Sequence, residues 1–228
     1  MLGPVHDLAR IVRHVRGTDA QAPVVHGRDD VREPVVALSF DDGPSEWTEP
    51  ILDLLRSAGA RATFFVIGEA VRGNEGILRR IHAEGHEVGN HTMTHVRLDT
   101  VGRLRIAREL RRGSAAIERV LGSRPIVFRP PGFHYTVAVL EVARAAGFER
   151  VTLASATTDD YIRDSGEEIV EAILPRVRPG GIIDLHDGRP PRESGSRADR
   201  RPTVAAVERL LAALPRHSFV TVSELFAR

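Results

Sequence analysis

Short apolar segments alternate with longer amphipathic segments from Pro34 to the end of the chain. The short segments have the length and the β-branched and aromatic content of strands, whereas the long ones repeat apolar residues every three or four positions, as helices do. The predicted strands are the segments 34–40, 62–68, 86–91, 125–129, 150–155, 180–186 and 218–222. The predicted helices are the segments 48–59, 74–85, 101–122, 137–147, 166–177 and 203–215.

This alternation is typical of a parallel sheet whose strands are joined by helical crossovers, either doubly wound or closed as a barrel. We expect one such catalytic domain over residues 34–228. Residues 1–33 are expected to form an N-terminal helix and a connecting segment. The helix is predicted at Asp7–Arg16, where apolar residues share one face, and residues 17–33 are polar and without a pattern.

Polar residues interrupt the pattern where the predicted strands end. They are Asp41 and Asp42 after the first strand, His91 and His95 after the third, Arg129 after the fourth, Asp159 and Asp160 after the fifth, and His186 after the sixth. The carboxyl ends of parallel strands meet at one end of a sheet or barrel, and such folds place their active sites there. We therefore expect these side chains to converge in space.

His91 and His95 are four residues apart, a spacing that would direct both imidazoles to a common centre within one helical turn. The spacing alone is weak evidence for metal binding, because it occurs by chance on many surfaces. The adjacent Asp41 and Asp42 offer a third ligand, although Asp-Asp-Gly-Pro also consists of turn-forming residues. Two histidines and one carboxylate leave coordination positions open, as in a catalytic zinc site.

Composition narrows the chemistry. The 228 residues include no cysteine, which excludes disulfides, thiolate catalysis and cysteine-ligated metal, and no lysine, which excludes a Schiff-base mechanism. A formal charge of +1 provides no broad basic field for nucleic acid. No apolar run has the length of a membrane span or of a secretory signal, so the sequence as written predicts a cytoplasmic protein.

Four motifs, in order, resemble those of the NodB-like polysaccharide deacetylases, also called carbohydrate esterase family four. They are LSFDDGP, GHEVGNHTMTH, FRPP and IIDLHD, and the resemblance extends roughly from Val35 to the end of the chain. It implies a distorted (β/α) barrel with the active site at the C-terminal ends of its parallel strands. It also implies that Asp42, His91 and His95 hold a divalent metal ion, which we expect to be zinc, with cobalt or nickel as alternatives.

The resemblance assigns a role to each remaining polar residue. Asp41 corresponds to the general base, and Arg129 to the arginine that positions it. His186 corresponds to the general acid, whose pKa we expect Asp160 to raise. The structural alternatives are a surface ion pair for Arg129 and a helix cap for His186. Substrate contacts are expected from Pro131, Gly132, Phe133, Tyr161 and Leu185.

The expected function is removal of N-acetyl groups from amino sugars or from a small N-acetylated glycoside by metal-activated water. The alternatives are the same site acting on a non-sugar amide or an O-acetyl ester, and a catalytically silent sugar-binding module. The presence of both an acid and a base argues against the silent module. Aromatic residues make up only 5% of the chain, so stacking platforms for a long sugar polymer are few and a short substrate is favoured.

Two segments depart from the family's usual pattern. Gly132-Phe133-His134 stands where the family commonly has Tyr-Gly, and Tyr161 replaces a tryptophan. The arginine-rich segment 187–202, directly after His186, reads as a solvated loop. A lid that binds an anionic group of the substrate is the alternative for this segment.

Overall fold

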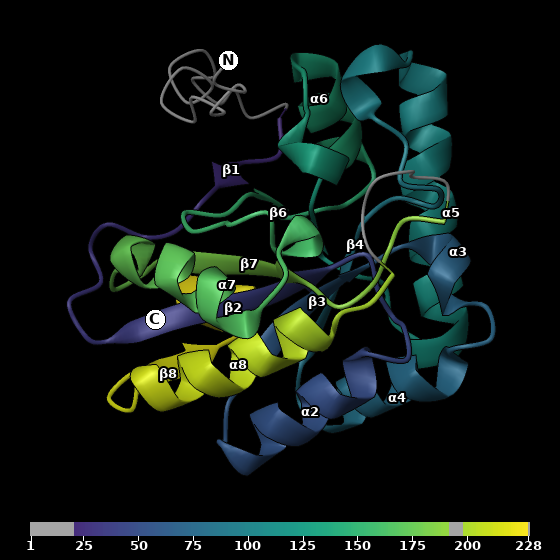
Figure 1. The fold of residues 1–228 in the computed structure, drawn as a ribbon. Coiled ribbons are helices and arrows are strands. Elements are labelled where there is room, and N and C mark those ends of the chain that lie inside the picture. The colour runs from purple at the N-terminus through teal and green to yellow at the C-terminus, as the bar shows by residue number, and fades with distance from the viewer. Residues whose placement is uncertain (1–20, 192–197, 228) are drawn as a thin grey trace, which may run out of the picture.

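The computed structural model describes residues 21–191 and 198–227, which form one layer of helices around a strongly curved parallel sheet (Figure 1). The strands are β1 (Val24–Val25), β2 (Val35–Asp41), β3 (Ala62–Val66), β4 (Glu87–Asn90), β5 (Val127–Phe128), β6 (Arg150–Thr152), β7 (Ile182–His186) and β8 (Ser218–Val220). The seven strands predicted from the sequence are thus confirmed, and β1 is an additional one.

Helices follow most strands. They are α2 (Thr48–Ser57), α3 (Gly68–Val71), α4 (Glu75–Ala83), α5 (Arg103–Leu121), α6 (Val137–Ala145), α7 (Gly166–Ile173), α8 (Arg201–Ala213) and α9 (Val222–Ala227), with 3-10 turns η1 (Leu98–Thr100), η2 (Pro131–Phe133), η3 (Asp160–Ile162) and η4 (Leu174–Arg176). Each of the six predicted helices is present. The helix predicted at Asp7–Arg16 lies outside the described residues.

The strands close into a distorted barrel. Parallel pairings place them in the order β1-β6-β5-β4-β3-β2-β7, and β8 also pairs with β2. Just after β6, Ala156 forms a parallel bridge with Ile183 of β7, and the backbone N–H of Asp184 donates to the Ala156 carbonyl at 2.9 Å. This contact joins β6 to β7, so the first and last strands of the ring meet. The (β/α) barrel implied by the resemblance is confirmed.

Residues 21–33 contribute to this fold rather than only leading into it. β1 pairs with β6 as a short extra strand outside the ring. Ala22 packs in the apolar cluster that contains Phe128 and Leu140, and Val31 packs inside the barrel. The sequence missed β1 because two apolar residues in a polar segment have no detectable period.

The two faces of β2 explain how the fold positions the site. All seven residues of this strand are buried. Phe40 points into the large core between the sheet and the helices, together with Ile51 of α2 and Val207 of α8. Successive side chains on a strand point to opposite faces, so Asp41 projects into the barrel, where Ala37 on the same face packs on inner apolar residues. A carboxylate therefore stands at the C-terminal end of a buried strand whose only other polar side chain is Ser39.

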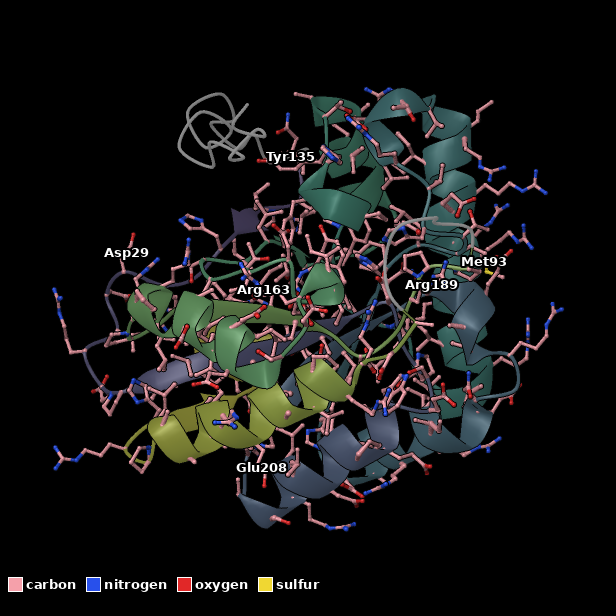
Figure 2. The ribbon with its side chains drawn as sticks, viewed as in Figure 1. Asp29, Met93, Tyr135, Arg163, Arg189 and Glu208 are labelled. Carbon is pink, nitrogen blue, oxygen red and sulfur yellow. The ribbon has the colours of Figure 1, made fainter. Side chains whose placement is uncertain are left out.

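The helices form a surrounding layer in which α6, α5, α4, α2, α8 and α7 are successive neighbours. Most of their charged residues, such as Glu208 on α8, lie on exposed faces (Figure 2), and Glu109 of α5 is a buried exception. Thr136 and Ser165 cap α6 and α7 by accepting the backbone N–H of the residue three positions later. Among the described residues, no helix combines the length and the apolar character needed to cross a membrane.

Candidate active site

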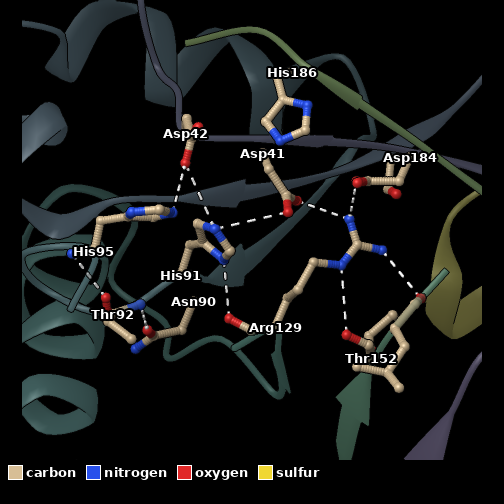
Figure 3. Close-up of polar contacts among 12 residues, drawn as sticks. Asp41, Asp42, Asn90, His91, Thr92, His95, Arg129, Thr152, Asp184 and His186 are labelled. Carbon is tan, nitrogen blue, oxygen red and sulfur yellow. Dashed lines mark hydrogen bonds and ion pairs between the residues drawn. The ribbon is translucent and has the colours of Figure 1, made fainter. Parts of the chain in front are cut away.

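Asp42, His91 and His95 come together at the C-terminal end of the barrel (Figure 3). Each offers one ligand atom, and these atoms all lie within 4.8 Å of one another. The Asp42 Oδ1 atom lies 3.6 Å from His91 Nε2 and 3.2 Å from His95 Nε2. The two stretches of chain are neighbours because β2 and β4 flank β3 in the sheet. The spatial convergence expected from the sequence is therefore present for this group.

The loop that carries the two histidines is not helical, so the helical turn predicted for residues 91–95 is wrong. Thr92 and His95 have positive φ angles of 67° and 56°, in the left-handed region. Left-handed backbone in residues other than glycine is costly and persists where surrounding contacts enforce it. Both imidazoles still face Asp42, but an irregular loop places them there.

Asn90, at the end of β4, braces this loop. Its Oδ1 accepts the backbone N–H of Thr92 at 2.6 Å, and its Nδ2 donates to the Leu110 carbonyl and to Ser114 Oγ, each at 2.9 Å. The Thr92 Oγ1 atom in turn accepts the backbone N–H of His95 at 3.0 Å. The loop is thus tied to α5 by buried hydrogen bonds. The Met93 side chain packs against Gly68 of α3, close to Gly113 of α5 (Figure 2).

The protonation states of the two imidazoles suit metal binding. His91 Nδ1 lies 2.9 Å from the Arg129 carbonyl, to which it donates, so the lone pair is on Nε2, the atom nearest Asp42. Burial, with the nearby Arg129 charge, lowers the pKa of His91 to about 3. Burial and the neighbouring His91 lower the pKa of His95 to about 3 as well. Neutral imidazole is the form that binds metals, so two nitrogens and one carboxylate oxygen fit a divalent ion with open positions.

Asp41, the residue that precedes Asp42, contacts Arg129 instead. Asp42 adopts a positive φ of 74°, which turns it away from the strand direction of Asp41. Asp41 Oδ1 accepts from Arg129 Nη1 at 2.7 Å, and its Oδ2 lies 3.7 Å from His91 Nε2. Adjacent carboxylates thus separate, one toward His91 and His95 and one toward a buried guanidinium.

Arg129 is fully buried and holds two carboxylates at once. Its Nη1 donates to Asp184 Oδ1 at 2.5 Å as well as to Asp41, while its plane covers the Phe65 ring with the guanidinium carbon 4.1 Å from the ring centre. Asp184 was missed from the sequence, although a charged residue inside the apolar segment IIDLH is a signal. Burial and the negative charge of Asp41 raise the pKa of Asp184.

A second group of potential metal ligands consists of Asp41, Asp184 and His186, again with ligand atoms within 4.8 Å of one another. Arg129 Nη1 already lies between the two carboxylates of this group, at 2.7 and 2.5 Å. A guanidinium in that position supplies the positive charge that a cation would bring. Of the two groups, Asp42, His91 and His95 are therefore the one that could hold a metal ion.

His186, at the end of β7, is paired with Asp160. The His186 Nδ1 atom lies 2.7 Å from Asp160 Oδ1, and Thr203 of α8 donates to Asp160 Oδ2 at 2.7 Å. Burial opposes the charged imidazolium, but the charge and hydrogen bond of Asp160 outweigh it and raise the pKa of His186 well above its usual value. The same pairing lowers the pKa of Asp160 against the effect of its burial. An imidazole with a raised pKa, paired with a carboxylate whose pKa is lowered, is the combination expected of a general acid.

Two further charged residues lie buried behind the site. Asp187 accepts from Thr48 Oγ1 at 2.5 Å through its Oδ2, and burial raises its pKa to about 7. Arg200 is 1% exposed and donates from Nε to the Gly188 carbonyl at 2.8 Å. Burial lowers the pKa of Arg200, while the nearby Asp160, Asp42 and Asp187 oppose that change. The segment 187–202 is therefore not solvated throughout, as its composition suggested; residues 192–197 lie outside the described part.

The predicted substrate residues have different surroundings. Tyr161 stacks edge-on against His186 with ring centres 5.0 Å apart, and Phe133 lies near the Arg129 guanidinium. Pro131 is buried, and Gly132 is exposed with a positive φ of 59°. Leu185 is fully buried in the outer core with Phe40, on the strand face opposite His186, so the structure does not bring it to the surface of the site.

The chain is similar to known proteins over most of its length. The model of the polysaccharide deacetylase family matches residues 28–151. The chain is 38% identical over 198 residues to a peptidoglycan-N-acetylglucosamine deacetylase of Bacillus cereus, covering 85% of this chain and 88% of that protein. It is 39% identical over 197 residues to a chitooligosaccharide deacetylase of Sinorhizobium fredii, covering 85% and 91%.

Solved structures share the fold as well. The crystal structure of the Bc1960 peptidoglycan N-acetylglucosamine deacetylase, in complex with 4-naphthalen-1-yl-N-oxidanyl-benzamide, superposes with a TM-score of 0.80 at 30% identity. The match covers 91% of this chain and 94% of the other. The family model matches more than half of the chain, and the two deacetylases named above are well above 30% identical to it. The chain belongs to the polysaccharide deacetylase family.

Proposed function

We propose that this protein is a metal-dependent hydrolase that removes N-acetyl groups from N-acetylglucosamine units of short glycans. One observation carries the proposal: Asp41 stands between the metal ligands and the acid. Its Oδ2 lies 3.7 Å from His91 Nε2, and a ring nitrogen of His186 lies within 4.8 Å of an Asp41 oxygen. An acid and a base that are so close together, beside one cation site, can act on the two sides of a single amide bond.

The three ligands would hold zinc or a similar divalent ion. Such an ion polarises the amide carbonyl and makes water acidic enough to be deprotonated at neutral pH. Zinc suits a site of two imidazoles and one carboxylate, and cobalt and nickel accept the same ligands.

Asp41 acts as the general base in this proposal. Its carboxylate is held by Arg129 through Oδ1, which leaves Oδ2 directed toward the metal ligands. A fixed carboxylate loses no rotational freedom when it takes the proton of the attacking water. Arg129 is buried and shielded from solvent, so its charge acts on Asp41 with little screening.

His186 acts as the general acid. The departing amine needs a proton as the C–N bond breaks, and the raised pKa of His186 keeps that proton available at neutral pH. In this proposal the backbone N–H of Gly132, at the turn that follows Arg129, stabilises the developing oxyanion, because the N–H groups of Phe133 and His134 are already donated to the Pro130 and Pro131 carbonyls.

The substrate class rests on the relatives and on the surface of the site. The named relatives act on peptidoglycan N-acetylglucosamine and on chitooligosaccharides. Among the described residues, the partly exposed aromatic side chains in contact with Arg129 or His186 are Phe133 and Tyr161, a small surface for stacking sugar rings. We therefore favour short N-acetylglucosamine oligosaccharides over long polymers. The relatives do not favour the alternative of a non-sugar amide or an O-acetyl ester.

The test is acetate release from N-acetylglucosamine oligomers of increasing length, from polymeric chitin and peptidoglycan, and from small non-sugar amides, each with and without a chelator. We expect chelator-sensitive release that is fastest on the short oligomers. Asp41→Asn should reduce kcat by at least about 100-fold while zinc and oligosaccharide still bind. Release that persists in Asp41→Asn, or activity confined to non-sugar amides, would contradict the proposal.

A further inference from the structure

We infer that Asp184 is a positioning residue for the base: it fixes the guanidinium of Arg129, and through it the carboxylate of Asp41. This inference rests on the proposed function, because it assigns Asp184 a part in the same reaction. Asp184 lies inside the motif IIDLHD, and the family resemblance assigned it no role. The inference comes from the contacts that this carboxylate makes.

The hydrogen bonds of Arg129 identify what holds it. Its two short contacts are to carboxylates, Asp184 at 2.5 Å and Asp41 at 2.7 Å, both from Nη1. Its contacts to backbone carbonyls, Thr152 from Nε at 3.4 Å and Leu153 from Nη2 at 3.3 Å, are long and correspondingly weak. Charge-assisted hydrogen bonds are about twice as strong as neutral ones. The orientation of the guanidinium therefore depends on the two carboxylates.

The sheet places these carboxylates side by side. Asp41 is paired with His186 in the register of β2 and β7, and Ser39 is paired with Asp184. Asp184 thus lies one step further into the barrel than His186, on the same face, and it reaches the Nη1 atom from the neighbouring strand. Asp184 is 1% exposed and fully enclosed, so solvent cannot take its place. Ser39 does not compete, since its hydroxyl donates to the Ile183 carbonyl.

The second carboxylate holds Arg129 in place independently of Asp41. Arg129 is fully buried, and a buried charge without a partner is strongly unfavourable. Asp184 gives Nη1 an acceptor at 2.5 Å on the neighbouring strand, so the guanidinium stays in place beside Asp41. The carbonyl of Arg129 also accepts from His91 Nδ1, so a displaced Arg129 would disturb a metal ligand as well.

Three variants test the inference. Asp184→Ala removes the acceptor without adding volume, and we expect kcat to fall about 100-fold while KM for the oligosaccharide changes less than about threefold. Asp184→Asn keeps an acceptor oxygen for Nη1 and should recover at least about a tenth of the wild-type kcat. Glu87→Gln is the control, because this carboxylate bonds Thr63 and Ser223 at the opposite end of the sheet and should leave kcat unchanged.

A double variant separates a positioning role from an independent one. If Asp184 acts through Arg129, then Arg129→Met with Asp184→Ala should be no less active than Arg129→Met alone. Asp184→Asn keeps the volume and an acceptor oxygen, so it is the variant to measure if Asp184→Ala does not fold. Losses that multiply, or wild-type kcat in folded Asp184→Ala, would overturn the inference.

A readout that does not need turnover distinguishes this inference from the proposed function. In crystals of zinc-loaded Asp184→Ala we expect the Arg129 guanidinium to rotate and its contact with Asp41 to lengthen, with zinc still bound. An unchanged Arg129 would overturn the inference even if the wild-type enzyme is active. Failure of the wild-type enzyme to release acetate from any sugar would instead refute the proposed function, whatever the position of Arg129.

Discussion

Asp160 holds His186 at two points: its Oδ1 lies 2.7 Å from the imidazole Nδ1, and its Oδ2 accepts the backbone N–H of the same residue at 3.0 Å. The ring and the strand end that carries it are therefore fixed by one carboxylate. The Nδ1 contact leaves the other ring nitrogen directed toward Asp41 (Figure 3). Neutralising this carboxylate should change the proton affinity of His186 more than its location.

Asp160→Asn should move the alkaline limb of the pH profile to lower pH. The charge of Asp160 raises the pKa of His186, so its loss lowers that pKa, and the protonated acid disappears at a lower pH. We expect kcat/KM at pH 8 to fall by at least about 10-fold, and to fall less at pH 6. The measurement is a pH profile of kcat/KM between pH 5 and 9. The exposed Asp164→Asn in the same segment is the control, and an unshifted alkaline limb in Asp160→Asn would contradict the assignment.

His95→Ala should abolish stoichiometric zinc binding. The metal would keep only Asp42 and His91, and we expect the affinity to fall by at least about 100-fold, measured by isothermal titration with zinc. In the wild-type protein the pKa values of both imidazoles are about 3, so protons should not compete with the metal for these nitrogens between pH 5 and 8. The exposed His82→Ala should bind zinc normally. Equal affinity in His95→Ala would exclude His95 as a ligand.

Asn90→Ala should loosen the histidine loop and destabilise the protein. It would leave the N–H of Thr92 and the Leu110 carbonyl without their buried partner, at a cost of about 2–4 kcal/mol. We expect a lower Tm together with weaker zinc binding, measured by thermal unfolding and by titration. Ser57→Ala removes an exposed hydrogen bond and is the control for both readouts. An unchanged zinc affinity would mean that the loop keeps its shape without Asn90.

Asp187→Asn should stabilise the protein increasingly as the pH rises. The pKa of Asp187 is about 7 in the folded state and 3.8 for an ordinary aspartate. The folded state therefore binds the proton more tightly, and the stability present below about pH 4 is lost as the pH rises toward 7. Asparagine avoids that loss and still accepts from Thr48. The difference in Tm between the chelator-treated variant and wild type, measured at pH 5 and at pH 8, should be larger at pH 8, and an equal difference would contradict the raised pKa.

Much of the fold was predictable from local patterns. The alternation of short apolar and longer amphipathic segments identified seven strands and six helices, because burial of one or both faces leaves a period in the sequence. β1 was not predictable, since two residues have no period and their pairing with β6 arises from contacts over more than one hundred residues. The closing contact between Ala156 and Ile183 was likewise invisible in any local window.

The site was predictable as a set of residues but not as a set of contacts. By themselves, the residues determined that Asp42, His91 and His95 follow strands whose carboxyl ends must meet, because parallel strands share one direction. The tertiary structure alone decided that an irregular loop aims the imidazoles, that Asp184 shares Arg129 with Asp41, and that Asp187 and Arg200 are buried behind the site. The physical reason is that the period of apolar residues indicates which face of a strand or helix a side chain lies on. Which charged group it contacts depends on the packing of strands that are distant in the sequence.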